Sequence, residues 1–305
     1  MPTLIYRDDM SEVWAGDCLL AEHVDAVLAG RTADAVVVDA PYSAKTHKGH
    51  ADGKVTTERA RAFATSQSNA FTPTTIKQPL KGATNRRAAR RYARHAKRRD
   101  IEYDAWTDWD VECFVAEWSP ACGWLVSITD SVLVKSWNSA AEDNGRVSFA
   151  PLPLVETGSR ARMTGDGPSS WTCFISVSRL RCSPWSKWGA LRGAYVVPGE
   201  RRFNAADPFK RIMGGKPLQA MLQLVEDYSR RGEMVIDPCC GAGTTLVAAK
   251  MLGRYSIGIE KDPATAAIAA RNLQATATQN ALPWRELGIE QGLLFESQAE
   301  ELPND

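Results

Sequence analysis

Hydrophobic and polar positions follow two different periods along this chain, and the alternation predicts a fold built from both strands and helices. Apolar runs of strand length, bounded by turn residues, occupy 13–17, 35–38, 123–128, 149–155, 172–177, 234–237 and 255–259. Apolar residues at helical spacing mark 19–28, 106–121, 218–228 and 246–252. Gly232 is expected to end the third of these helices. We therefore expect an α/β domain, whose parallel strands carry functional residues at their carboxyl ends.

The charge of the chain is unevenly distributed. The 305 residues carry 37 Lys and Arg against 36 Asp and Glu, yet the stretch from Lys77 to Arg99 holds ten bases and no acid. The rest of the chain is therefore about nine units negative by the same count, and the basic stretch suits a polyanionic partner. Its bases recur at helical spacing among alanines, so a basic helical stripe is expected; a solvated surface helix is the plainer alternative. The DNA-contacting candidates are Arg86, Arg87, Arg90, Arg91, Arg94, Lys97 and Arg98.

Composition limits the class of protein. Hydrophobic residues at 44% and charged residues at 24% are typical of a folded globular chain. No apolar run approaches the roughly 20 residues of a membrane span, and the first residues lack a signal pattern, so we expect a cytoplasmic protein without a membrane partner. Seven cysteines without a CxxC pair indicate reduced thiols, and no metal site is expected.

Two short motifs carry candidate chemistry. One is the strand-end tetrapeptide Asp39-Ala40-Pro41-Tyr42. The other is a strand–loop–helix–strand unit in which Asp237 ends a strand, Gly241 and Gly243 form a turn, and Glu260 ends the next strand. The glycines let the backbone approach a ligand, and the terminal acid is placed to accept ribose hydroxyls. The third glycine of a dinucleotide loop is missing, which disfavours NAD, and no Gly-Lys-Ser/Thr follows, which excludes a P-loop.

Together these motifs resemble the exocyclic-amine (N6-adenine or N4-cytosine) DNA methyltransferases. Residues 237–245 (DPCCGAGTT), followed by GIE at 258–260, resemble the S-adenosylmethionine loop of that family, and residues 39–42 resemble its catalytic D/N/S-P-P-Y. The catalytic motif precedes the cofactor loop, and residues 14–18 and 215–217 also match, as in the permuted beta group. The resemblance implies a doubly wound, mostly parallel Rossmann-like sheet of the S-adenosylmethionine methyltransferase type, formed by one permuted domain over 1–305.

The resemblance also assigns roles to individual residues. Asp39 would accept one N–H of the target amine, the Ala40 carbonyl the other, and Tyr42 would stack on a base flipped out of the duplex. Ala40 stands where the family has a proline, and Cys239 where it commonly has phenylalanine, which suggests a looser turn and weaker cofactor binding. The cofactor-binding candidates are Asp17, Lys216, Asp237, Pro238, Cys239, Gly241, Gly243, Thr244, Thr245, Glu260 and Lys261.

Two less regular stretches are expected to contact DNA. Residues 45–100 are interpreted as a basic insertion of loop and helix that acts as a DNA-binding or target-recognition arm. Residues 135–202 are interpreted as an irregular region and a second target-recognition element.

The function expected from this reasoning is methyl transfer from S-adenosyl-L-methionine to an exocyclic amine of double-stranded DNA. Adenine N6 is preferred because the tetrapeptide begins with Asp, where cytosine enzymes more often carry Ser. The alternatives are cytosine N4, RNA methylation, and a catalytically degenerate DNA-binding protein. A homodimer and a cognate restriction nuclease stay open, and the resemblance implies a bacterial or phage source.

Overall fold

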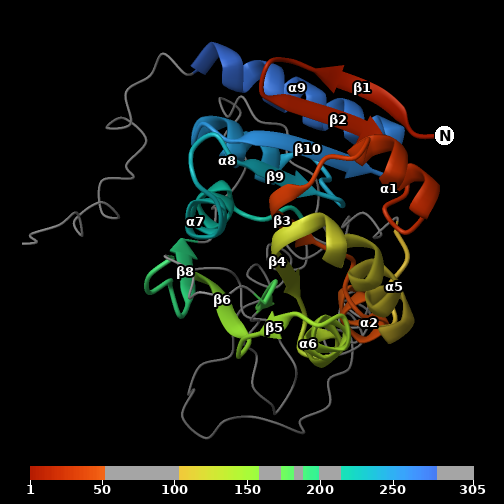
Figure 1. Ribbon diagram of the computed structural model, residues 1–305, viewed down its shortest axis with the longest axis vertical. Coiled ribbons are helices and arrows are strands. Elements are labelled where there is room, and N and C mark those ends of the chain that lie inside the picture. Colours follow the sequence, from red (N-terminus) through yellow and green to blue (C-terminus); the bar gives the residue numbers. More distant parts are fainter. Residues whose placement is uncertain (52–102, 158–172, 182–187, 199–213, 280–305) are drawn as a thin grey trace, which may run out of the picture.

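A single sheet runs through the described part of the protein, and helices cover both of its faces (Figure 1). The computed structural model describes residues 1–51, 103–157, 173–181, 188–198 and 214–279. The strands are β1 Thr3–Arg7, β2 Ser11–Ala15, β3 Ala33–Asp39, β4 Cys122–Thr129, β5 Val147–Ser148, β6 Leu152–Thr157, β7 Cys173–Arg179, β8 Tyr195–Pro198, β9 Met234–Asp237 and β10 Tyr255–Glu260. The helices are α1 Ala21–Leu28, α2 Ala44–Ala51, α5 Asp108–Trp118, the 3₁₀ turn η1 Ser119–Ala121, α6 Val134–Asp143, α7 Leu218–Tyr228, α8 Thr244–Met251 and α9 Pro263–Gln279.

The centre of the sheet is parallel, and antiparallel pairs flank it on both sides. The strand order is β1-β2-β10-β9-β3-β4-β7-β6-β8, with β5 also paired to β7. Strands β2, β10, β9, β3 and β4 run parallel to one another, whereas β1 and β7 join them antiparallel. The central strands are nearly continuous in apolar residues because helices bury them from both sides.

Two hydrophobic layers enclose the parallel strands. On one face, α1, α5 and α6 pack their apolar residues against alternate positions of β3 and β4, such as Val36 and Leu125. On the other face, α7 and α8 cover the intervening positions, such as Val37 and Val126. The period of two along each strand therefore sends neighbouring side chains into different layers.

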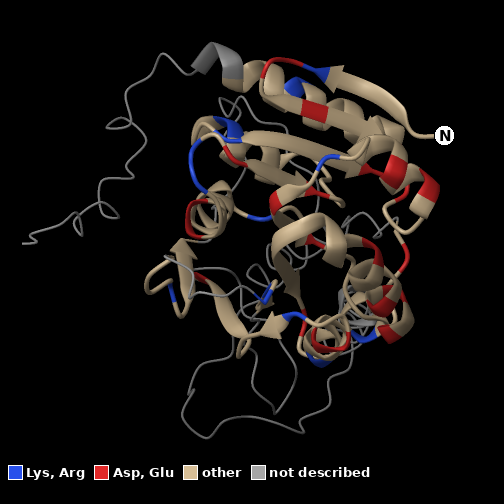
Figure 2. Cartoon of the chain, in the orientation of Figure 1, with Lys and Arg blue, Asp and Glu red and all other residues tan. Residues whose placement is uncertain are grey.

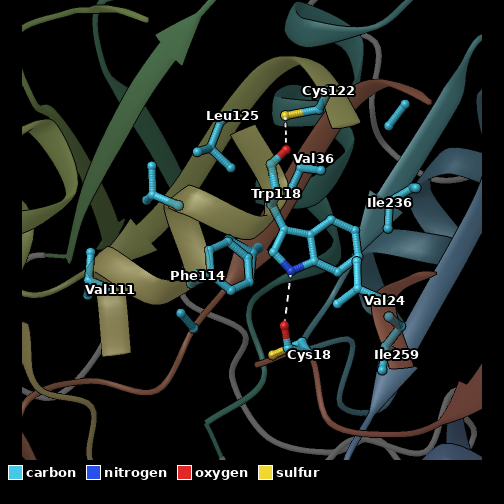
Figure 3. Packing of buried hydrophobic residues seen from close by; sticks show 14 of the residues in the cluster. Cys18, Val24, Val36, Val111, Phe114, Trp118, Cys122, Leu125, Ile236 and Ile259 are labelled. Carbon is cyan, nitrogen blue, oxygen red and sulfur yellow. Dashed lines mark hydrogen bonds between the residues drawn. The ribbon is translucent and has the colours of Figure 1, made fainter. Parts of the chain in front are cut away.

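Trp118 links the first layer to a loop at the edge of the sheet (Figure 3). Its indole ring is fully buried and packs beside Phe114, and its Nε1–H donates to the Cys18 carbonyl at 3.1 Å. The thiol of Cys122 in turn lies 3.3 Å from the Trp118 carbonyl. The end of α5 is thus fixed both to β4 and to the turn after β2.

The structure corrects several boundaries expected from sequence. The helix over 218–228 has the expected bounds, but Gly232, expected to end it, lies in the following turn at φ +82°. The next helix begins at Thr244, because Gly243 adopts φ +80° and precedes its first turn. The 106–121 helix begins at Asp108, where Thr107 and Asp110 form a capping box.

Regular elements occur in both stretches that were expected to contact DNA. The first residues of 45–100 belong to α2, and the rest of that stretch, including the seven basic DNA-contact candidates, lies outside the described residues. Within 135–202, the described residues form most of α6 and the four strands β5 to β8, so the expectation of an irregular region is wrong for them. Two of these strands, β6 and β7, overlap the strand-like runs expected at 149–155 and 172–177, whereas β5 and β8, of two and four residues, were not expected from the sequence. No helix among the described residues has the length and apolar character needed to cross a membrane.

Arg146 is the buried polar group that holds the antiparallel part of the sheet in place. It lies between α6 and β5, and its side chain is fully buried. Its guanidinium donates to the carbonyls of Ser119, Cys122 and Gly123 at 2.9, 3.1 and 2.7 Å, and to the hydroxyl of Ser178 at 3.0 Å. One side chain thereby joins η1, β4 and β7.

We expect Arg146→Met to lower the free energy of unfolding by about 3 kcal/mol, because it leaves several buried carbonyls without donors. Urea unfolding measures the loss. Arg179→Met is the matched control, since Arg179 contacts the Leu180 carbonyl and the Phe149 ring near the surface, and should change stability by less than about 1 kcal/mol. Equal losses in both variants would contradict this role of Arg146.

Candidate functional site

The candidate site lies where the direction of chain progression through the sheet reverses. From β9 the chain continues to β10 on one side, and from β3 it continues to β4 on the other, while β3 and β9 pair with each other. Asp39 ends β3 and Asp237 ends β9. Because these strands are parallel, both carboxylates lie at the same edge of the sheet, in the crevice where open α/β sheets bind ligands.

Asp39 is held by two side chains from different parts of the chain. The Lys216 ammonium, which precedes α7, donates to Asp39 Oδ2 at 2.8 Å. The Tyr42 hydroxyl lies 3.2 Å from Asp39 Oδ1 and 3.4 Å from the Cys173 thiol at the start of β7. Lys216 Nζ also lies 4.9 Å from the centre of the Tyr42 ring. The four side chains form one cluster around the catalytic motif expected from sequence.

The charges in this cluster reinforce each other. Burial alone would lower the pKa of Lys216, but the Asp39 carboxylate, together with Cys173 and Tyr103, outweighs it and the pKa is raised. Burial and the same carboxylate raise the pKa of Tyr42 well above its ordinary value. Lys216 therefore stays a cation and Tyr42 a neutral hydroxyl that can donate to Asp39.

The expected cofactor loop begins with a buried acid. Asp237 is 2% exposed, and its Oδ1 accepts the N–H of Cys239 at 3.1 Å. Burial raises its pKa to about 7, although hydrogen bonds from the Thr245 side chain and the Cys239 backbone partly offset the rise. The carboxyl is thus poised between its neutral and charged forms near neutral pH.

Glu260 closes the other side of this loop. Its carboxylate accepts the N–H of Gly241 at 2.9 Å and that of Asp262 at 3.0 Å. Burial raises its pKa, and the two backbone donors counter part of that rise. Gly258, two residues earlier, has no room for a side chain: a Cβ there would lie 2.5 Å from Leu246 Cδ1 and 2.8 Å from Cys240 Sγ. Side chains of the loop and of α8 therefore pack directly against the backbone of β10.

The turn after β2 completes the same edge. Asp17 pairs with Lys261 at 2.9 Å, and this contact, together with the Leu19 N–H, outweighs burial and lowers the pKa of Asp17. Cys18 and Cys239 bring their sulfur atoms to 3.5 Å, so the turn touches the cofactor loop directly. Asp17 and Lys261, both expected to bind cofactor, are thereby placed beside the loop.

The structure brings most of the sequence-based candidates together. Asp39, Ala40, Pro41 and Tyr42 follow β3, and Pro238, Gly241, Gly243, Thr244 and Thr245 lie between β9 and the first turn of α8. Lys216, expected on the cofactor side, contacts Asp39 instead.

Three residues of the site escaped the sequence reasoning. Cys173 lies in the strand-like run expected at 172–177 but gave no sign of a role in the site, and Tyr103 follows the basic insertion. The phenol of Tyr103 is close enough to Asp39 and Glu260 for both carboxylates to add to the rise in its pKa that burial causes. Asp130 directly follows a strand that was expected from the sequence. Of the three, Asp130 alone carried a usable signal, an acid at a strand end.

Comparison with solved structures defines the class of fold. The crystal structure of the M1.HpyAVI–SAM complex superposes with a TM-score of 0.56 at 15% identity, over 87% of this chain and 99% of that one. The chain therefore has the doubly wound Rossmann-like fold of methyltransferases, and the fold class expected from the sequence is confirmed.

Sequence comparison then finds similarity to the family that the motifs indicate. Residues 181–271, which include the cofactor loop, match the family model described as DNA methylase. The type II methyltransferase M.BglI of Bacillus subtilis is 30% identical over 100 residues, 33% of this chain and 27% of that protein. The type II methyltransferase M.HindIII of Haemophilus influenzae is 43% identical over 58 residues, 19% of each protein. The resemblance to exocyclic-amine DNA methyltransferases is confirmed, through matches that span about a quarter or less of these relatives.

The raised pKa of Asp237 predicts a pH-dependent stability. Its folded pKa of about 7 exceeds the usual value of 3.8, so the native state holds this proton more tightly, and the resulting stabilisation is lost as the pH rises through 7. Between pH 5.5 and 8.5 the wild-type protein should lose about 2 kcal/mol through this group. In Asp237→Asn, which is always neutral, that loss should be absent.

Urea unfolding of both proteins at the two pH values measures the difference. Asp17→Asn serves as the control, because the pKa of Asp17 is lowered and its titration lies below this range. A parallel pH dependence in wild type and Asp237→Asn would contradict the assignment.

Proposed function

We propose that this protein transfers a methyl group from S-adenosyl-L-methionine to an exocyclic amine of a base in double-stranded DNA, with adenine N6 as the target. The observation that carries the proposal is the meeting of two motifs at one edge of the sheet. The cluster of side chains around Asp39 lies at the end of β3. The loop between Asp237 and Glu260 follows β9, the strand that pairs with β3. An amine-binding group and a nucleoside-binding loop are thereby side by side.

The residues of the loop fit this cofactor chemically. Asp237 and Glu260 offer acceptors suited to hydroxyl and ammonium groups, and the Asp17–Lys261 pair adds a charge of each sign beside them. The positive φ of Gly241 and Gly243 turns the backbone sharply between these acids. When bound, S-adenosyl-L-methionine supplies a methyl group already activated by its sulfonium.

Asp39 and Ala40 supply the acceptors that an exocyclic amine requires. The lone pair of such an amine is delocalised into the ring, so acceptors for its two N–H bonds favour the localised, nucleophilic form. We assign one N–H to the Asp39 carboxylate and the other to the Ala40 carbonyl. Lys216 and Tyr42 orient the carboxylate, and the Tyr42 ring offers a face on which a flipped base stacks.

The charge distribution supports an approach of DNA at the carboxyl edge of the sheet. Helices α1 and α5 carry acids and neither Lys nor Arg, and they lie on one face of the sheet (Figure 2). A polyanion is repelled from that face. The basic residues 86–98 are proposed to contact phosphates, and 45–100 and 135–202 to contribute target recognition.

The preference for adenine rests on Asp39 at the first tetrapeptide position. Cytosine N4 and RNA are the competing substrates, and a catalytically inactive DNA-binding protein is the competing class. A cytoplasmic protein of a bacterium or phage is proposed, in keeping with the relatives in Bacillus subtilis and Haemophilus influenzae. A second copy of the chain and a cognate restriction nuclease are the candidate protein partners.

Transfer of labelled methyl from S-adenosyl-L-methionine to unmethylated duplex DNA tests the function. Digestion of the product to nucleosides should give labelled N6-methyl-2′-deoxyadenosine. Asp39→Ala should lower the rate at least about 100-fold, because it removes a group that acts on the reacting amine, while cofactor binding in calorimetry persists. Label on cytosine would reassign the base. Cofactor binding without transfer to DNA would move the substrate to RNA, and neither binding nor transfer would favour the inactive class.

Lys216→Met separates the two roles open to Lys216. Since its ammonium contacts Asp39, we expect the turnover number to fall at least about 10-fold, with the dissociation constant for S-adenosyl-L-methionine changed less than about twofold. Weakened cofactor binding with unchanged turnover would instead support the cofactor role expected from sequence.

Lys250→Met is the matched control for this measurement. Lys250 is also buried, at 6% exposure, and pairs with Asp8 beside α9. Its loss should cost stability but leave the turnover number of the folded protein unchanged.

A further inference from the structure

Asp130 lies directly beyond the strand next to the catalytic motif. It follows β4, which pairs with β3 so that Asp39 is opposite Ile128. Its side chain is buried, at 5% exposure. A buried carboxylate at the carboxyl edge of a parallel sheet is either a ligand group or a fixed support for one, and its hydrogen bonds decide between these.

The carboxylate of Asp130 grips the segment that follows the catalytic tetrapeptide. Its Oδ2 accepts the backbone N–H of Ser43 at 3.0 Å, the hydroxyl of Ser43 at 2.5 Å and that of Thr46 at 2.5 Å. Its Oδ1 accepts the N–H groups of Val132 and Leu133 at 2.9 and 3.0 Å. Both oxygens are engaged by protein donors, which makes Asp130 a support and not a ligand group.

The support acts next to the residues that the reaction requires. Ser43 is bonded covalently to Tyr42, and the Tyr42 carbonyl accepts the N–H of Trp106 at 3.2 Å. Upstream, the strand ladder fixes Asp39. Ala40 has no ring to restrict its φ, so the tetrapeptide is anchored chiefly by the segments on its two sides.

We propose that Asp130 is a positioning residue for methyl transfer, which holds the Asp39–Tyr42 loop in its productive geometry by binding Ser43 and Thr46. The inference rests on the proposed function. A 1 Å displacement of a reacting group is enough to slow an enzyme strongly, so loss of this grip acts on turnover. The pKa of Asp130 is lowered because these hydrogen bonds outweigh its burial, which keeps the carboxylate ionised as an acceptor.

Two variants that remove different numbers of these hydrogen bonds test the positioning role of Asp130. Asp130→Asn keeps the shape but places an NH₂ group or a single carbonyl where the carboxylate accepts five donors, and the turnover number should fall at least about 10-fold. Ser43→Ala removes one donor and should lower it about threefold. The dissociation constant for S-adenosyl-L-methionine, measured by calorimetry, should change less than twofold in both.

Asp227→Asn provides the matched control. Asp227 is likewise a buried carboxylate, at 8% exposure, and it accepts the Tyr195 hydroxyl at 2.6 Å and pairs with Arg192, away from the catalytic motif. It should lower the melting temperature without lowering turnover. Equal losses of turnover in Asp130→Asn and Asp227→Asn, or turnover within twofold of wild type in folded Asp130→Asn, would overturn the proposal.

Hydrogen–deuterium exchange keeps this test independent of the proposed function. In Asp130→Asn, amides within 39–47 should exchange at least about 10-fold faster than in wild type, while those of 237–245 stay unchanged. Unchanged exchange in 39–47, or equally faster exchange in both segments, would overturn the positioning role. Absence of methyl transfer by the wild-type protein would overturn the proposed function. The exchange result would still show whether Asp130 holds the 39–47 segment in place.

Discussion

The short parallel pairing of β3 with β9 is the contact on which the whole site depends. Its paired residues, Ala35 with Val235 and Val36 with Ile236, are all fully buried. The pairing joins segments about 200 residues apart in sequence and brings the ends of both strands to one edge. Burial of apolar surface on both faces of the sheet, and not proximity along the chain, therefore sets the relation between Asp39 and Asp237.

Buried polar side chains convert this edge into a defined arrangement. Lys216 ties the segment before α7 to β3, Asp130 ties the start of α2 to β4, and Glu260 ties the loop after β9 to β10. Each of these contacts crosses between two elements. Because an unpaired polar group is costly in a low-dielectric interior, each fixes the position of its loop more firmly than apolar packing would.

Local patterns in the sequence predict the cofactor half of the site well. The helix 218–228 and the strand 234–237 have the expected bounds, since each is a short, strongly apolar segment between clear turn signals. The acids Asp39 and Asp237 are recognisable because they end such strands. Contacts between distant segments could not be predicted in this way. Lys216 contacts Asp39, 177 residues away, because of the order of the strands in the sheet, and a local hydrophobic pattern carries no information on that order. Strands β6 and β7 overlap runs that the sequence marks as strand-like, but β5 and β8 are too short for a clear pattern, and no local pattern shows that these strands belong to the same sheet.

The close packing at Gly258 has a consequence for how this sequence can diverge. Any other residue there must displace both Leu246 and Cys240, which belong to α8 and to the loop before it. A single substitution cannot be absorbed by one neighbour, so drift at this position requires concerted change in three elements. Position 258 is therefore expected to vary far less among descendants of this chain than the exposed positions of the same strand, such as Tyr255.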